Sequence, residues 1–161
     1  MIVADLMTEH TACIRPNQSL SDAARLMWEC DCGALPVLNS AGEVCSMITD
    51  RDICMATWLR DSPPHAIPVF SVMSRHLHFC APSDPLSSAE ALMREKQVRR
   101  VPVLNPEGQL LGILSLADLA KETARGVRAG LLADEVATTL ADICRASAPA
   151  KGSEGSTWSS A

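Results

Sequence analysis

Two pairs of side chains in this sequence combine a hydroxyl group with a carboxylate three residues later. They are Thr49 with Asp52 and Ser115 with Asp118, and each follows an apolar run that reads as a strand leading into a helix. A helix amino terminus offers free N–H groups and a partial positive charge to an anion. The hydroxyl can help to bind a phosphate, and the carboxylate can accept two hydrogen bonds from a diol such as ribose. The same spacing is that of a capping box, which only starts a helix, so the spacing alone leaves both interpretations open.

Arginine side chains are the next candidates for binding an anion. Arg99 and Arg100 are adjacent and precede a short apolar strand, and Arg51 stands inside the first hydroxyl–carboxylate pair. Guanidinium groups form strong, often bidentate hydrogen bonds with phosphate. The alternative for the adjacent pair is two solvated surface charges.

Histidine and cysteine side chains give only a weak indication of metal binding or redox chemistry. His76, His78 and Cys80 alternate along an expected strand and share one face, but no fourth ligand accompanies them, so no metal site is assigned. Cys30 and Cys32 flank one residue at the end of an expected helix, where free or buried thiols are a simpler interpretation than a redox pair. A metal- or redox-responsive protein is kept as an alternative.

Composition and missing motifs narrow the class of protein. The chain has 161 residues, seven of them cysteine, with a net charge of −5 and 3% aromatic residues, which disfavours nucleic-acid binding. No apolar run is long enough to span a bilayer, and an odd cysteine count without a secretory signal indicates reduced thiols in the cytoplasm. No nucleophile–base pair or Gly-rich phosphate loop is present, so we expect no enzyme and no required cofactor.

An internal repeat organises the chain. Shifted by 66 residues, the sequence matches itself without gaps, and Pro-Val-Leu-Asn occurs at 36–39 and again at 102–105. Residues 5–58 and 71–124 are therefore predicted to be two copies of one unit. Each copy reads as strand, helix, strand, strand and helix.

The expected elements follow the same order in both copies. Each begins with an extended segment that ends at a proline, followed by a capped helix, a hairpin and a last helix. We expect extended segments at Thr11–Pro16 and Leu77–Pro82, caps at Ser19 and Asp84, hairpins at Ala34–Ile48 and Val101–Leu114, and last helices from Thr49 and Ser115. One more helix is predicted from Leu132, Val136, Leu140 and Ile143, with Asp134 as a possible cap.

These elements predict an α+β fold of two βαββα repeats packed with pseudo-twofold symmetry, plus a C-terminal helix. One unit alone buries too little surface, and packing two copies through their strands leaves two clefts between them. The predicted boundaries are repeat 1 at 1–60, a linker without regular structure at 61–70, repeat 2 at 71–125, a helical extension at 126–146 and a disordered tail at 147–161.

The doubled motifs resemble a tandem pair of CBS domains, often called a Bateman module. The matching features are Met7-Thr8 and Met73-Ser74, the two Pro-Val-Leu-Asn strands, Thr49-Asp50-Arg51-Asp52, and Gly112 with Ser115 and Asp118. The resemblance covers residues 3–124. It implies a stand-alone regulatory module that binds AMP, ADP, ATP, S-adenosylmethionine or an NAD-like ligand in its clefts and signals to an unknown protein target.

The resemblance also implies roles for single residues. It puts Thr49 and Asp52 in one cleft and Ser115 and Asp118 in the other. It directs Arg99 or Arg100 to the Asp52 cleft, which would make that cleft the better site. Where the second copy has Gly112, the first has Ser46, and a serine there is expected to narrow the first cleft or alter its strand.

The family further implies a homodimer formed through the repeat helices. Apolar side chains near the helix ends are expected to be exposed for that contact: Met27, Trp28, Met55 and Trp58. The rival interpretation is a structural or interaction dimer whose clefts are vestigial.

Overall fold

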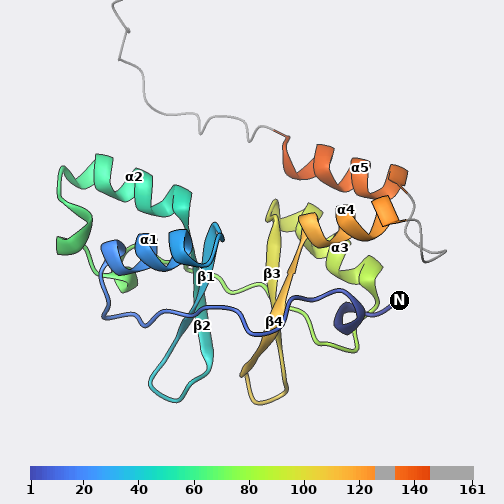
Figure 1. The fold of residues 1–161 in the computed structure, drawn as a ribbon, viewed down its shortest axis with the longest axis horizontal. Coiled ribbons are helices and arrows are strands. Elements are labelled where there is room, and N and C mark those ends of the chain that lie inside the picture. Colours follow the sequence, from blue (N-terminus) through green and yellow to red (C-terminus); the bar gives the residue numbers. More distant parts are fainter. Residues whose placement is uncertain (126–132, 146–161) are drawn as a thin grey trace, which may run out of the picture.

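The computed structural model describes residues 1–125 and 133–145. In this part of the chain, five α-helices accompany two antiparallel hairpins (Figure 1). The helices are α1 (Leu20–Glu29), α2 (Asp50–Arg60), α3 (Leu86–Lys96), α4 (Leu116–Arg125) and α5 (Ala133–Ile143). The strands are β1 (Ala34–Leu38), β2 (Val44–Thr49), β3 (Arg100–Leu104) and β4 (Leu110–Ser115). The predicted α+β fold and the C-terminal helix are thus confirmed.

The two hairpins have the same register, one repeat length apart. In the first, Ala34 lies opposite Thr49, and in the second, Arg100 lies opposite Ser115. Each ladder is interrupted at the same place, before the last residue of β1 and of β3. The shared register brings the strand-to-helix turns of both repeats to equivalent positions, at the end of the molecule where the helices gather (Figure 1).

The hairpin turns also touch each other. Gly42 and Gly108 have φ values of +84° and +78°, a conformation that favours glycine over other residues. Glu43 forms an isolated bridge with Gln109, and the Val44 N–H donates to the Gly108 carbonyl at 2.9 Å. The hairpins are therefore joined at the end opposite the helices.

The first strand of each repeat is shorter than predicted. Ile14 and Cys80 each form one parallel bridge, to Val37 and Val103, and neither lies in a continuous strand. The physical reason is a proline on each side of the bridge, since proline has no N–H with which to extend a ladder. Pro16 and Pro82 stop it after the bridge, and Pro36 and Pro102 on the neighbouring strands stop it before the bridge.

The segment that leads into each repeat packs in the hydrophobic core of the other repeat. Val3, in the 3₁₀ turn Val3–Asp5, packs in the core of the second repeat. Ile67 and Val69, just before the second repeat, pack in the core of the first. Each repeat therefore completes the core of the other.

The same exchange is visible in backbone hydrogen bonds. The Thr8 N–H donates to the Ile113 carbonyl on β4 at 2.8 Å. Its counterpart 66 residues later, Ser74, donates to the Met47 carbonyl on β2 at 2.9 Å. The repeats are thus interlocked around a pseudo-twofold axis.

The expectation that the linker has no regular structure is wrong. Pro64–Ala66 forms a 3₁₀ turn and Val69–Ser71 forms another. Ile67 between them is 2% exposed. The linker is held because its apolar residues fill the first core.

One predicted helix cap is confirmed and one is wrong. Ser19 caps α1 and exchanges hydrogen bonds with Asp22 in a capping box. Asp84 does not cap α3, which begins at Leu86; its carboxylate accepts the Ala81 N–H at 2.8 Å and closes the preceding turn.

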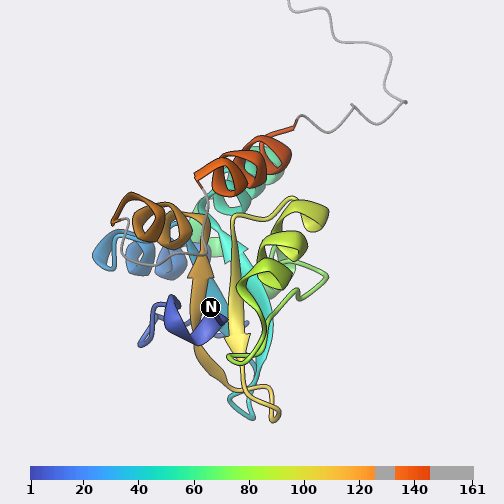
Figure 2. The same cartoon turned by 90° about the vertical axis from the view of Figure 1, so that its right-hand side faces the viewer.

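Helix α5 lies across α3 and α4, and Figures 1 and 2 agree on this placement. Val136 and Ile143 are buried in the second core. The helix begins at Ala133, so Asp134 lies within it and is not its cap. The predicted tail at 147–161, Leu132 and the first part of the extension, 126–132, lie outside the described residues. None of the described helices is long and apolar enough to cross a membrane.

Candidate functional site

Both hydroxyl–carboxylate pairs form capping boxes. The Thr49 hydroxyl donates to Asp52 Oδ2 at 2.7 Å, and the Ser115 hydroxyl donates to Asp118 Oδ2 at 2.5 Å. In each pair the backbone N–H of the first residue also donates to Oδ2, at 2.9 Å. These bonds engage only one carboxylate oxygen, so the cap does not use Oδ1 of either aspartate.

A third capping box in this chain shows what the motif does by itself. Ser19 donates to Asp22 Oδ2 at 2.7 Å at the start of α1. Neither residue lines either of the cavities described below. A hydroxyl–carboxylate pair is therefore not a sign of a binding site here unless its surroundings provide one.

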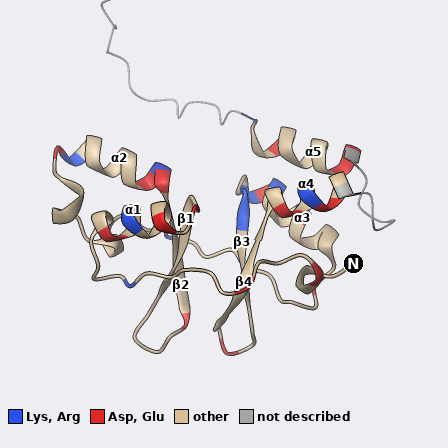
Figure 3. Cartoon of the chain, viewed as in Figure 1, with Lys and Arg blue, Asp and Glu red and all other residues tan. Residues whose placement is uncertain are grey.

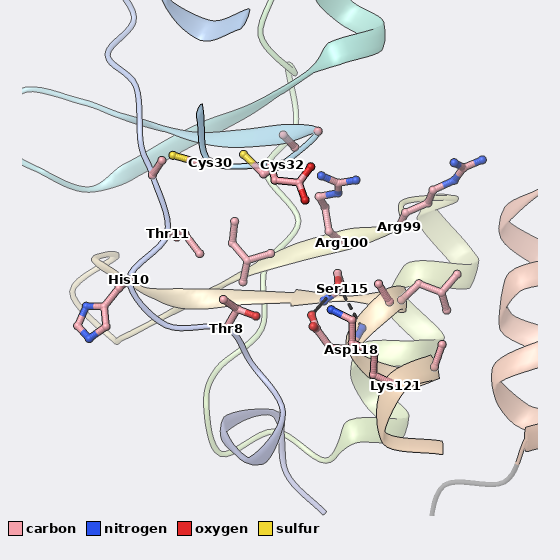
Figure 4. Close-up of a pocket in the computed structure, with 18 of the residues that line it drawn as sticks. Thr8, His10, Thr11, Cys30, Cys32, Arg99, Arg100, Ser115, Asp118 and Lys121 are labelled. Atoms are coloured by element: carbon pink, nitrogen blue, oxygen red, sulfur yellow. Dashed lines mark hydrogen bonds between the residues drawn. The ribbon is translucent and has the colours of Figure 1, made fainter. Parts of the chain in front are cut away.

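Ser115 and Asp118 do have such surroundings. They line a cavity of about 660 Å³ between the two repeats, close to the start of α4 (Figure 4). Thr11 and Cys30 from the first repeat line the same cavity. A volume in this range suits a small-molecule ligand.

Thr49 and Asp52 line the pseudo-symmetric counterpart, a cavity of about 480 Å³. Arg51 lines it too, together with His76 and His78 from the segment that leads into the second repeat. The structure therefore places the two predicted pairs in two separate cavities between the repeats.

The expectation that the adjacent arginines face the Asp52 cavity alone is wrong. Arg99 and Arg100 line both cavities, because they stand where the chain enters β3, on the wall that the cavities share. Figure 3 shows this blue segment at the helix end of β3. Their position therefore does not assign the arginines to one cavity.

The first-turn N–H groups do distinguish the two helices. At α4, the Leu116 N–H donates to the Arg99 carbonyl and the Asp118 N–H to the Ser115 hydroxyl. Within the described residues, the Ala117 N–H between them has no hydrogen-bond partner. An anion in the Asp118 cavity would therefore meet a free donor on a positive helix end.

At α2 the corresponding donors are occupied. The Arg51 N–H donates to the side chain of Asp50 at 2.7 Å, the Asp50 N–H donates to the Gly33 carbonyl, and the Asp52 N–H donates to the Thr49 hydroxyl. Asp50 takes the place of Leu116 and adds a negative charge at this helix end. Among the described residues, the first turn of α2 therefore offers an anion fewer free N–H donors than the first turn of α4.

The serine at position 46 does not narrow a cavity. Ser46 is fully buried, its hydroxyl donates to the Ser74 carbonyl at 2.6 Å, and it lines neither cavity. Its counterpart Gly112 faces the equivalent carbonyl, and a Cβ there would lie 2.6 Å from Thr8 O. Position 46 thus affects the contact between the repeats, not the ligand space.

Several residues that line the larger cavity were not identified from the sequence, among them Lys121, His10 and Thr11. Lys121 follows Asp118 by three residues on α4, so the helical spacing was an available signal. His10 and Thr11 had no such signal, because the exchange of leading segments brings them to the second repeat. His10 has a φ of +54°, and Thr11 Oγ1 is buried with no hydrogen-bond partner among residues 1–125 and 133–145.

The histidine and cysteine side chains considered in the sequence do not form a metal centre among the residues that the structure describes. In the described part of the chain, no group of three or more His, Cys, Asp and Glu side chains is placed to hold a metal ion. All seven cysteines are free thiols. Burial raises the pKa of Cys80 to about 11 and also raises the pKa of Cys32, so both thiols are less reactive than usual.

Comparison with known proteins identifies the repeats. The family model described as CBS domain matches residues 3–58 and 69–125. CBS domain-containing protein YhcV of Bacillus subtilis is 38% identical over 128 residues, which is 80% of this chain and 89% of that protein. Hypoxic response protein 1 of Mycobacterium tuberculosis is 31% identical over 117 residues, which is 73% of this chain and 81% of that protein.

Solved structures have the same fold. The crystal structure of Hypoxic Response Protein I with two coordinated zinc ions matches with a TM-score of 0.68 and 30% identity, covering 75% of this chain and 98% of that one. The crystal structure of CBSX2 in complex with AMP matches with a TM-score of 0.67 and 25% identity, covering 79% and 98%. Relatives with enzyme names are matched over only 24% and 23% of their length. This chain therefore belongs to the CBS domain family, with one domain in each repeat.

Proposed function

We propose that this protein is a non-enzymatic regulatory module that binds an adenosine-type nucleotide between its two CBS domains. The ligand class comprises AMP, ADP, ATP, S-adenosylmethionine and NAD-like molecules. Occupancy would shift the arrangement of the repeats, and a protein partner would sense that shift. The observation that carries the proposal is the larger cavity, where a capped helix end and two arginines surround a space of about 660 Å³.

Each part of a nucleotide has a matching group in that cavity. The Ala117 N–H, Arg99 and Arg100 offer donors and positive charge to a phosphate. Asp118 Oδ1, which the cap leaves unused, can accept hydrogen bonds from ribose hydroxyls. Apolar side chains such as Leu116 line the same space and can cover the face of a base. The AMP complex of CBSX2, a relative of the same fold, supports this ligand class.

The Asp52 cavity is proposed as a second and weaker site. Thr49, Arg51 and Asp52 would contact the ligand there, with Arg99 or Arg100 from the shared wall. The occupied N–H groups of α2 and the charge of Asp50 oppose an anion at this helix end. This proposed order reverses the sequence-based expectation, which counted the arginines for the Asp52 cavity only; they line both cavities.

A structural role is the second candidate function. It is favoured by the capping boxes, because the Ser19–Asp22 box shows that this chain uses the same motif outside both cavities between the repeats. In that case the clefts would be vestigial and the module would act as an assembly unit.

The test is calorimetric titration with AMP, ADP, ATP and S-adenosylmethionine, using GMP as a control. We expect at least one adenosine ligand to bind more tightly than GMP. Asp118→Ala should remove the tighter event and Asp52→Ala should spare it. The opposite pattern would restore the Asp52 cavity as the better site, and a lack of binding by every ligand would support the structural role.

We also propose a homodimer that uses the outer face of α1 and α2. Trp28 is 88% exposed, Trp58 72% and Leu59 68%, and Met55 lies on the same helices. Met27, expected to be exposed, is buried at 6% and belongs to the first core. Light scattering should give a dimer at tens of micromolar. A monomer at that concentration would contradict the proposal.

A further inference from the structure

Helix α5 lies outside both segments that match the CBS family model, the second of which ends at residue 125. It nevertheless reaches both cavities. Val136 and Leu140 line the larger cavity, and Ile143 lines the smaller one. An element added to the second repeat thus supplies part of the wall of each proposed ligand site.

The two residues that follow α5 also contact the wall that the cavities share. Gln97 Nε2 donates to the Arg145 carbonyl at 3.2 Å. Arg99 Nη2 lies 3.9 Å from Cys144 Sγ, within hydrogen-bond range for sulfur. Arg99, which is proposed to meet a ligand phosphate, is therefore also in contact with the residue that directly follows α5.

The interface between α5 and α3 contains buried polar atoms that lack hydrogen-bond partners within residues 1–125 and 133–145. Glu90 on α3 is buried, and its Oε1 has no hydrogen-bond partner among the described residues. Thr139 on α5 is fully buried, and its hydroxyl also lacks a partner in that part of the chain. Glu135 on α5 is near enough to raise the pKa of Glu90. Buried polar groups without partners weaken an interface, so these two groups make the packing of α5 less stable than an apolar contact would.

In the first repeat, the surface equivalent to the one that α5 covers has no helix packed on it among the described residues. The surfaces of α1 and α2 form an open groove of about 510 Å³ lined by Ala24, Met27 and Ile53. Ala24 is the counterpart of Glu90, 66 residues earlier. The fold does not require a helix at this place, because the first repeat is complete without one.

We propose that α5, which lines the nucleotide site, can separate from α3 and α4. Nucleotide binding and the packing of α5 on these helices then stabilise each other. The inference rests on the proposed function and adds the element through which ligand occupancy is transmitted. A nucleotide in the larger cavity gains apolar contact with Val136 and Leu140. By reciprocity, a bound nucleotide holds α5 on α3 and α4, and its loss releases the face that α5 covers.

The first test is amide hydrogen exchange of α5 in the full chain, with and without saturating AMP. Exchange at residues 136–143 should slow when AMP binds. The effect should disappear in Asp118→Ala. Protection of α5 by AMP that persists in Asp118→Ala would overturn the proposal, because the ligand would then act from elsewhere.

The second test is AMP affinity of two α5 variants. Leu140→Ala removes a cavity-lining side chain that is 46% exposed, and Ala141→Ser changes an exposed neighbour that does not line either cavity. Loss of one partly covered leucine should weaken AMP binding about fivefold, and the control should bind as the wild type does.

The outcomes separate this inference from the proposed function. AMP that binds wild type and Leu140→Ala equally, without slowing exchange in α5, would overturn the role of α5 and leave nucleotide binding intact. AMP that binds neither protein would overturn both.

Discussion

Replacing Glu90 by methionine is expected to stabilise the protein at neutral pH. Glu90 is 6% exposed on α3, and its Oε1 has no hydrogen-bond partner among the described residues. Burial is the main cause that raises its pKa, Glu135 raises it further, and Arg94 acts in the opposite direction. Methionine has a similar length and no buried charge to desolvate, so it should fill the same space without either penalty.

The size of the effect follows from the unsatisfied group. A buried polar group without a partner costs about 1–3 kcal/mol. In a chain of this length, each kcal/mol shifts the melting temperature by about 2–4 °C, so Glu90→Met should melt about 2–12 °C higher at pH 7.

The gain should shrink as the pH falls. In the folded wild type the raised pKa makes Glu90 take up a proton before it does so in the unfolded chain. Protonation therefore stabilises the wild type as the pH falls through that raised pKa, and the effect is complete below the ordinary value of 4.5. The variant has no such carboxyl and should approach the wild type in stability near pH 4.5.

The assay is thermal unfolding followed by circular dichroism at pH 7 and pH 5. Glu95→Met is the matched control, because Glu95 lies on the same helix with its side chain 69% exposed and pairs with Lys96 at 2.7 Å. The control should change stability by no more than ~0.5 kcal/mol. A Glu90→Met protein that melts at or below the wild-type temperature at pH 7 would refute the reasoning, as would a gain independent of pH.

Three further predictions concern other parts of the molecule. Gly112→Ala should destabilise by about 1–3 kcal/mol in urea unfolding, because the new Cβ would lie 2.6 Å from Thr8 O; an unchanged midpoint would show that the strand can shift. Cys80, with its pKa raised to about 11, should resist a thiol reagent at pH 8 until the protein unfolds, and rapid labelling of Cys80 in the native state would count against its burial. Arg99→Gln should weaken nucleotide binding about tenfold or more, whereas Arg15→Gln, outside both cavities, should not; equal affinities would remove Arg99 from the site.

The repeat made much of the fold predictable. Once Pro36 was aligned with Pro102, the same order of strands and helices followed for both copies, and both hairpins are confirmed. The Ser19–Asp22 cap could also be predicted, because it depends only on local spacing. Asp84 failed as a cap because a nearer donor, the Ala81 N–H, takes its carboxylate.

Features that depend on contacts between the repeats could not be predicted from spacing. The exchange of leading segments buries Ile67 in what reads as a linker, because its partners lie in the first core. The exchange also decides the direction of Ser46, whose hydroxyl meets Ser74 and not the cavity. Arg99 lies on a wall shared by two cavities, and no linear pattern encodes such a position.

The most direct test of nucleotide binding between the CBS domains is the AMP affinity of Asp118→Ala compared with Asp22→Ala. Both variants lose an equivalent capping box, worth ~1 kcal/mol of stability, but only Asp118 lines the cavity. Calorimetric titration should show AMP binding at least about tenfold weaker in Asp118→Ala and unchanged in Asp22→Ala. Equal AMP affinity in the two variants would contradict the account.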